Sequence, residues 1–235
     1  MINIRKLNQL GKGDHGWLKS NFHFSFADYF SRDNMNFGQL RVINDDLISP
    51  HMGFDTHPHQ NMEIITYVRS GAISHKDNMG NKGVTKAGDV QVMSAGTGVY
   101  HSEYNNTDEQ VSLYQIWIMP NEKGVKPRWD QEKFPSEPVT GELPVLVSGR
   151  NADQRHGVLF IHQDAAIYGG KINKSTIVTN KIKHQAYILI SEGEVEIEGK
   201  KLTKGDGAEI TKQSSISVKA LSDAEILILD VPPRG

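Results

Sequence analysis

Short runs of β-branched and aromatic residues, each ended by a turn, recur along the whole chain. Examples are Glu63–Val68, Val111–Met119, Tyr187–Ile190 and Glu225–Asp230. Strand-length segments at near-regular spacing, separated by glycine-containing turns, are typical of β-sandwiches and β-barrels. No segment keeps an apolar period of 3.6 residues for long, so helices should be few and short. We therefore expect an all-β protein.

The two halves of the chain repeat one weak pattern of strand, glycine turn, strand and Gly-Asp turn. The turns are Ser70-Gly71 and Gly88-Asp89 in the first half, and Glu192-Gly193 and Gly205-Asp206 in the second. Segment 120–144 between the halves is rich in proline and is typical of a surface connector.

This pattern predicts two β-barrels rather than one. We place the first barrel at residues 1–122, the connector at 123–142 and the second barrel at 143–235. One large β-domain with coincidental turns is the alternative.

Composition excludes several classes of site. The chain has no cysteine, so thiolate metal sites, disulfides and iron–sulfur clusters are ruled out. Its formal net charge is -2 with no cluster of Lys and Arg, so we expect no direct contact with nucleic acid. The amino terminus lacks an apolar signal segment and no run is long enough to span a membrane. We expect a cytoplasmic protein with no membrane contact.

Two dipeptide spacings carry the predicted chemistry: His57-Pro58-His59 and His101-Ser102-Glu103. In a strand, residues i and i+2 point to the same face, so each pair can aim both side chains into one barrel. Three imidazoles and a carboxylate suit several divalent transition metals. Ten histidines in the chain make one His-x-His pair unremarkable by itself, so its surroundings decide.

Those surroundings resemble the two cupin motifs. The stretch from Gly53 to Gly71 contains the His-x-His pair, a glutamate four residues later at Glu63 and a closing glycine. Gly53 lies nearer His57 than in the common form. The second motif runs from Gly88 through Gly96, Gly98 and His101 to Asn105, with Ser94 where many cupins have proline.

Finer details resemble the pirin family, specifically over residues 15–120 and loosely over 143–235. Asn78 departs from this pattern, where serine is common. The matching strings are Phe24–Ala27, Thr56–His59, His75–Asn81, Met93–Gly98, His101–Asn105 and Gln115–Trp117.

The resemblance implies two cupin (jelly-roll-type) barrels with one metal site, in the first barrel. Its ligands would be His57, His59, His101 and Glu103. The resemblance implies iron, Fe(II), and the ligand set also suits Mn, Ni, Co, Cu or Zn. Glu63, a ligand in many other cupins, would be displaced by Glu103 and serve near the site instead.

The second half has single histidines at His156, His162 and His184 and no His-x-His pair. We therefore expect a structural second barrel with a degenerate metal site.

The resemblance also implies an activity: a quercetinase-type dioxygenase that cleaves the heterocyclic ring of a flavonol with O2 and releases carbon monoxide. Glu103 would be the catalytic residue, accepting the proton of the substrate hydroxyl. The alternative is a non-catalytic, metal-dependent transcriptional cofactor that acts through a protein partner. A sugar isomerase or another cupin reaction at the same site is a third possibility.

The other histidines and large side chains have simpler interpretations. We expect His15 and His23 to pack among aromatic residues, His51 to lie in a loop and His75 to hydrogen-bond the loop that follows it. Met93, Tyr114 and Trp117 are expected in the core rather than in a substrate cavity.

Overall fold

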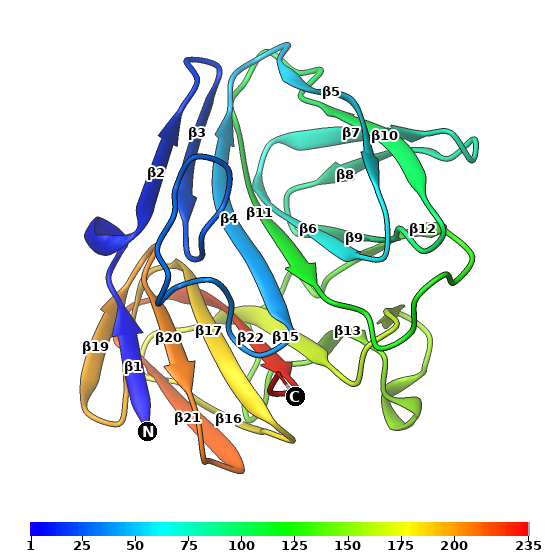
Figure 1. Cartoon of the computed structure of the whole chain (residues 1–235). Helices are drawn as coiled ribbons and strands as arrows, with labels where there is room; N and C mark the ends of the chain where they lie inside the picture. The colour runs from blue at the N-terminus through cyan, green and yellow to red at the C-terminus, as the bar shows by residue number, and fades with distance from the viewer. Residues whose placement is uncertain (235) are drawn as a thin grey trace.

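The structure is a computed structural model that describes residues 1–234, and it shows two β-barrels side by side (Figure 1). Each barrel combines a seven-stranded sheet with a four-stranded sheet. The helices in these residues are two 3-10 turns of three residues each, η1 (Leu7–Gln9) and η2 (Asn151–Asp153). Neither is long and apolar enough to cross a membrane. The expected all-β class with few short helices is confirmed.

The first barrel contains eleven strands. In spatial order, its seven-stranded sheet consists of β12 (Arg128–Lys133), β9 (Asp89–Ser94), β6 (Glu63–Ser70), β11 (Val111–Ile118), β4 (Leu40–Ile48), β3 (Leu18–Phe22) and β2 (Gly11–Asp14). Its four-stranded sheet consists of β5 (Gly53–His59), β10 (Val99–Tyr104), β7 (Ala72–Asp77) and β8 (Lys82–Lys86).

The second barrel repeats this architecture. Its seven-stranded sheet consists of β1 (Ile2–Arg5), β20 (Gly207–Ile210), β17 (Gln185–Glu192), β22 (Ala224–Val231), β15 (Ala166–Ile172), β13 (Val145–Ser148) and β14 (Leu159–Phe160). Its four-stranded sheet consists of β16 (Ile177–Lys181), β21 (Ser215–Ala220), β18 (Glu194–Ile197) and β19 (Lys200–Thr203). The pattern of two barrels therefore replaces the alternative of one large β-domain.

The two barrels share an apolar core between their seven-stranded sheets. Ile65 and Ile116 from the first barrel belong to the same buried cluster as Leu189 and Leu229 from the second. Tyr187 of β17 is fully buried in this cluster. Because burying one large apolar side chain stabilises a fold by roughly 1.5–3 kcal/mol, an interface with many of them holds the barrels as one unit.

This shared core explains why β6 shows no regular alternation of apolar and polar residues. Side chains alternate between the two faces of a strand, and both faces of β6 are covered. Ile65 and Tyr67 point to the second barrel, whereas Ile64 and Thr66 point into the first. The strand therefore has no solvent face that would require a polar alternation.

The interiors of the two barrels differ in chemistry. The second is filled by one large cluster of mainly aliphatic side chains, such as Ile188, Val195 and Ile226. The first holds two smaller apolar clusters, one around Ile73 and one around Met93. Histidine, glutamine and glutamate side chains are buried in the same barrel. The candidate site lies among these polar groups.

The domain limits drawn from the sequence, 1–122, 123–142 and 143–235, stay a proposal. Two strands pair with a strand on the other side of one of these limits. β1, at the amino terminus, pairs with β20 of the second barrel (Figure 1). β12, within the proposed connector, pairs with β9 of the first barrel. The chain thus begins in the second barrel's sheet before it builds the first.

Candidate metal centre

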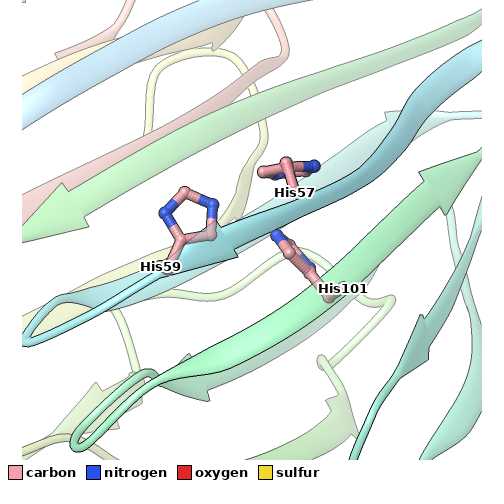
Figure 2. A group of neighbouring side chains, drawn as sticks. All are labelled: His57, His59 and His101. Atoms are coloured by element: carbon pink, nitrogen blue, oxygen red, sulfur yellow. The ribbon is translucent and has the colours of Figure 1, made fainter.

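Two neighbouring antiparallel strands carry three histidines of the site. His57 and His59 are two residues apart on β5, and His101 on β10 lies directly opposite His57. The ring centroids are 4.4 Å apart for His57 and His101, 4.9 Å for His57 and His59, and 5.0 Å for His59 and His101. One ring nitrogen from each lies within 4.8 Å of the other two. Figure 2 shows the three imidazoles gathered over the two strands.

A bulge in β5 re-aims the side chains beside the histidines. His101 pairs with His57, but Glu103 pairs with Phe54, so β5 has one residue more than β10 over this interval. The extra residue resets the alternation of side chains, and Phe54 and Glu103 both line the same cavity. Gly53 permits the close approach of the strands, because a Cβ there would lie 2.2 Å from the Glu103 carbonyl oxygen.

Glu103 is buried and held by hydrogen bonds to its carboxylate. Gln91 Nε2 donates to Oε1 at 2.7 Å and Gln115 Nε2 donates to Oε2 at 2.8 Å. The Thr66 hydroxyl also donates to Oε1, at 3.3 Å. Glu103 forms a second potential ligand group with His75 and His101. Within residues 1–234 no single such group holds all four predicted ligands, and His101 is the residue that the two groups share.

The charge state of the histidines favours metal binding. Burial and the nearby His101 and His57 imidazoles lower the pKa of His59 to about 4. Burial and the His57 and His75 imidazoles lower the pKa of His101 to about 3. Both rings are therefore neutral near pH 7, and the neutral imidazole is the form that binds a metal.

Two ring nitrogens are left free to act as ligands. The Nδ1 of His57 lies 2.7 Å from the Asp55 carbonyl oxygen, which can only accept, so the lone pair of His57 is on Nε2. The Nε2 of His101 is buried without a hydrogen-bond partner in the described part of the chain. A buried polar atom with no partner destabilises a fold unless something binds it. A divalent transition metal, for which imidazole is a good ligand, fits this donor set.

A buried relay sets the orientation of His101. Its Nδ1 lies 3.4 Å from Nδ1 of His75, and Nε2 of His75 lies 3.1 Å from Oδ2 of Asp77. The backbone N–H groups of Met79 and Asn81 donate to Oδ1 of Asp77 at 2.9 and 3.0 Å. A carboxylate that fixes the proton on His75 Nε2 leaves His75 Nδ1 to accept from His101. The free nitrogen of His101 is then Nε2.

Sequence reasoning missed this role of His75. Its hydrogen bond to Asp77, at the start of the following turn, agrees with the simple interpretation. What the sequence did not show is that β7 pairs with β10, which places His75 opposite Glu103 and Asp77 opposite His101. The Trp129 ring stacks on His75 at 5.0 Å. The one available signal was the His75-x-Asp77 spacing, which puts both side chains on one face of a strand.

A cavity of about 420 Å³ opens onto the histidines. Its apolar walls are largely aromatic. The ring centroids of Trp17 and Phe54 are 5.3 Å apart and those of Phe26 and Trp117 are 5.5 Å apart, and both pairs pack edge to face. The Trp117 ring also contacts His59 at 5.0 Å. Trp117 therefore lines the cavity, which corrects its expected place in the core: strand parity puts it on the inner face of β11.

Met93 and Tyr114 are in the core as expected. Met93 belongs to one of the two small apolar clusters inside the first barrel, and Tyr114 belongs to the core that the two barrels share. Glu63 is fully buried, and its Oε2 accepts a hydrogen bond from Ser94 at 2.7 Å. It precedes Ile64, whose side chain lines the cavity. Strand alternation thus places Glu63 on the opposite face of β6 from the histidine centre.

The remaining histidines of the first half take separate places. His23 is fully buried, and its Nδ1 lies 2.9 Å from the Tyr187 hydroxyl in the shared core. His15 is exposed and lines the cavity. His51 is exposed, with its Nε2 2.8 Å from Asp108.

The histidines of the second half do not meet inside the second barrel. His156 is exposed, His184 lies 2.9 Å from Asp164, and His162 stacks edge to face on Phe160 at 4.8 Å. The two groups of potential metal ligands in residues 1–234 both lie in the first barrel.

Two barrels of this architecture, with a cluster of histidines inside the first, define a bicupin. The chain belongs to the pirin family: the Pirin family model matches residues 3–118, and a model described as the quercetinase C-terminal cupin domain matches residues 145–231. The expected pair of cupin barrels is confirmed by these matches.

Similar proteins cover the whole chain. The pirin-like protein of Caulobacter vibrioides is 46% identical over 232 residues, which are 98% of this chain and 99% of that protein. The quercetin 2,3-dioxygenase of Escherichia coli K12 is 45% identical over 236 residues, 99% of this chain and 100% of that protein. Other bacterial relatives carry the same enzyme name in a provisional form.

Solved structures agree. The E. coli protein YhhW superimposes with a TM-score of 0.92 at 45% identity, covering 99% of this chain and 98% of that one. A second structure of the same bacterial pirin, in complex with nickel(II), has a TM-score of 0.91 at 44% identity and covers 99% of this chain and 100% of that chain.

Proposed function

We propose that this protein is a metal-dependent dioxygenase of the quercetinase type, which cleaves the heterocyclic ring of a flavonol with O2 and releases carbon monoxide. The observation that carries the proposal is one cavity, walled by aromatic rings, that ends on three histidines and a buried glutamate. Its volume, about 420 Å³, is in the range of small-molecule sites. The quercetin 2,3-dioxygenase name of the E. coli relative supports the substrate class.

The metal would be held by His57, His59, His101 and Glu103, with Fe(II) as the expected ion. A bound divalent metal supplies Lewis-acid polarisation, which lowers the pKa of a coordinated hydroxyl group. The nickel(II) complex of the E. coli pirin supports a divalent site in this fold. The imidazoles of His59 and His101 keep their neutral form near pH 7 because burial lowers the pKa of both groups.

Glu103 would accept the proton of the flavonol 3-hydroxyl group. Its Oε1 accepts two hydrogen bonds, from Gln91 and Thr66, whereas its Oε2 accepts one, from Gln115. The freer lone pair is on Oε2. It would bind the metal, and it would hold the proton once Glu103 has detached from the metal. The two glutamine amides fix the carboxylate plane before substrate arrives, so little reorganisation is needed during proton transfer.

The aromatic walls would orient the substrate. Trp17 and Phe54 form one edge-to-face pair in the cavity lining and Phe26 and Trp117 form another, and they offer ring faces and edges to a flat polycyclic molecule. By filling the space beside the histidines they exclude water from the reacting atoms.

The test is oxygen uptake and carbon monoxide release by the iron-loaded protein with quercetin. We expect His57→Ala and Glu103→Ala to reduce turnover at least 100-fold, the order seen when a positioned acid–base group is lost. His51→Ala, which changes an exposed histidine outside the site, is the matched control and should retain full turnover. Metal content of protein purified without chelators or a metal-binding tag identifies the ion.

Oxygen uptake no higher than that of free iron would contradict the enzyme proposal. That result would leave the metal-dependent regulator that acts through a protein partner.

A further inference from the structure

One wall of the cavity is polar, although it lies inside the barrel. Ser20 on β3 and Asn44 and Asp46 on β4 line the cavity, and 5%, 5% and 2% of their surfaces are exposed. Interior positions of a barrel strand are ordinarily apolar, as they are in the second barrel. Burying polar groups there destabilises the fold unless they find hydrogen-bond partners.

The three side chains of this polar wall find only some of the hydrogen-bond partners that they need. Ser20 Oγ donates to Asp46 Oδ1 at 2.5 Å. Asn44 Oδ1 is buried and has no hydrogen-bond partner within residues 1–234. Burial raises the pKa of Asp46 to about 7, so near neutral pH a part of the protein has a protonated Asp46 that can donate as well as accept. The wall therefore offers unused hydrogen-bonding capacity to whatever enters the cavity.

The polar wall is continuous with the candidate metal centre. Asn44 lies directly opposite Gln115 in the β4–β11 pairing, and Gln115 donates to Glu103. On the other side, Ser20 lies opposite Asp46 in the β3–β4 pairing. The row runs from Glu103 through Gln115 and Asn44 toward Asp46. It lies in the seven-stranded sheet, whereas His57 and His101 come from the four-stranded sheet.

We propose that Ser20, Asn44 and Asp46 form a second subsite, which recognises a hydroxyl group on the part of an aromatic substrate that lies away from the metal ligands. This inference rests on the proposed function and deepens it by naming the class of substrate: polyhydroxylated aromatic rings rather than unsubstituted ones. A site built to hydrogen-bond a hydroxyl discriminates against the analogue that lacks it, because its own polar groups then stay unpaired.

The test compares two ligands with the same 3-hydroxy-4-keto pair. Quercetin carries further hydroxyl groups on both outer rings, and 3-hydroxyflavone carries none. Binding is measured by calorimetry on the zinc-loaded protein, because zinc is not redox-active and no turnover occurs. The wild-type protein should prefer quercetin, and Asn44→Leu should weaken quercetin binding roughly 3- to 10-fold, as expected for one lost hydrogen bond, with 3-hydroxyflavone unchanged.

Controls separate recognition from damage to the fold. Asn106→Leu makes the same change at an exposed position and should retain the preference for quercetin. Ser20→Ala is a smaller change to the same wall, which serves if Asn44→Leu fails to fold, and it should reduce the preference in the same direction. An unchanged preference in the folded variants, or an equal loss for both flavonols, overturns the subsite.

A further arm tells failure of the subsite from failure of the proposed function. Binding of resorcinol and of benzene to the same zinc-loaded proteins is followed by ligand-observed NMR. If quercetin is not turned over by the iron-loaded protein but Asn44→Leu removes the preference for resorcinol, the subsite stands and the quercetinase proposal fails. If quercetin is turned over, but Asn44→Leu changes neither the preference for quercetin over 3-hydroxyflavone nor that for resorcinol over benzene, the quercetinase proposal stands and the subsite fails.

Discussion

At the scale of single residues, the centre depends on protons that are fixed by groups outside it. His57 has its proton fixed by the Asp55 carbonyl oxygen, and His101 has its proton fixed by His75. Each of these hydrogen bonds leaves the lone pair on the Nε2 of its histidine, where it can bind a metal. The partner group itself supplies no ligand atom. Such outer partners commonly change metal affinity by 10- to 100-fold when they are removed.

We therefore expect His75→Ala to weaken metal binding about 10- to 100-fold while His57, His59 and His101 remain. The variant loses the acceptor for His101 Nδ1, so that ring can adopt the wrong tautomer. Competition with a chromogenic chelator, using zinc or cobalt(II), measures the affinity directly. His51→Ala should show the wild-type value, and an equal value for His75→Ala would mean that the relay does not orient His101.

Glu63 provides a prediction on pH at the same scale. Burial raises the pKa of this carboxyl from 4.5 to about 7. The unfolded chain loses the proton near pH 4.5, whereas the folded protein keeps it to about pH 7. Between these values the folded state binds more protons, so its stability falls as pH rises. Glu63→Gln removes this loss.

The Gln variant should gain stability relative to the wild-type protein as pH rises from 4.5 to 8, by up to about 3 kcal/mol for a pKa shift of this order. Urea unfolding at the two pH values measures the difference. If the gap between the two proteins stays constant over this range, Glu63 is not protonated in the folded state.

At the scale of elements, strand alternation was enough to predict part of the centre. The i, i+2 spacing of His57 and His59 places both on one face of β5 whatever strand lies beside it. Which residues face them depends on register, and register is set by contacts between strands that are far apart in the sequence. That is why the bulge opposite Ser102 and the role of His75 could not be predicted from the sequence.

The overall fold was also predictable only in part. The turn pattern predicted two barrels, because each turn is encoded by the residues that form it. The partner of β1 is encoded in β20, about 200 residues later, so proximity in sequence suggested the first barrel for a strand that pairs in the second.

The bulge itself can be tested with Gly53→Ala. The added Cβ would lie 2.2 Å from the Glu103 carbonyl oxygen, so β5 has to move away from β10. We expect a stability loss of about 1–3 kcal/mol and weaker metal binding, because the strands that move carry all the histidines of the centre. Thermal unfolding and metal titration measure the two effects.

Gly170→Ala is the matched control for this change. Gly170 also lies in a strand, β15, but its added Cβ would meet its nearest neighbour, a Val139 side-chain carbon, at 3.5 Å, an ordinary contact. Metal affinity should be unchanged in this variant. A Gly53→Ala protein with wild-type affinity would show that the centre tolerates movement of β5.

At the scale of the whole molecule, the second barrel supports the first through the shared core. Tyr187 lies where the barrels meet: its ring contacts Phe24 and Phe37 of the first barrel at 5.4 and 5.9 Å, and its hydroxyl lies 2.9 Å from Nδ1 of His23. The polar interior of the first barrel weakens its own apolar core. A good part of its stability should therefore come from this interface.

Tyr187→Ala should lower stability by about 3–5 kcal/mol, the usual cost of removing a large buried ring. In a chain of this length that corresponds to a fall in Tm of roughly 6–20 °C. Phe30→Ala, at a phenylalanine that is 74% exposed, should change Tm little. Because the barrels share one core, the metal site should be lost in the same transition as the bulk β-signal, although Tyr187 belongs to the other barrel. Separate transitions for cobalt(II) absorbance and circular dichroism would show that the first barrel holds its centre without help from the second.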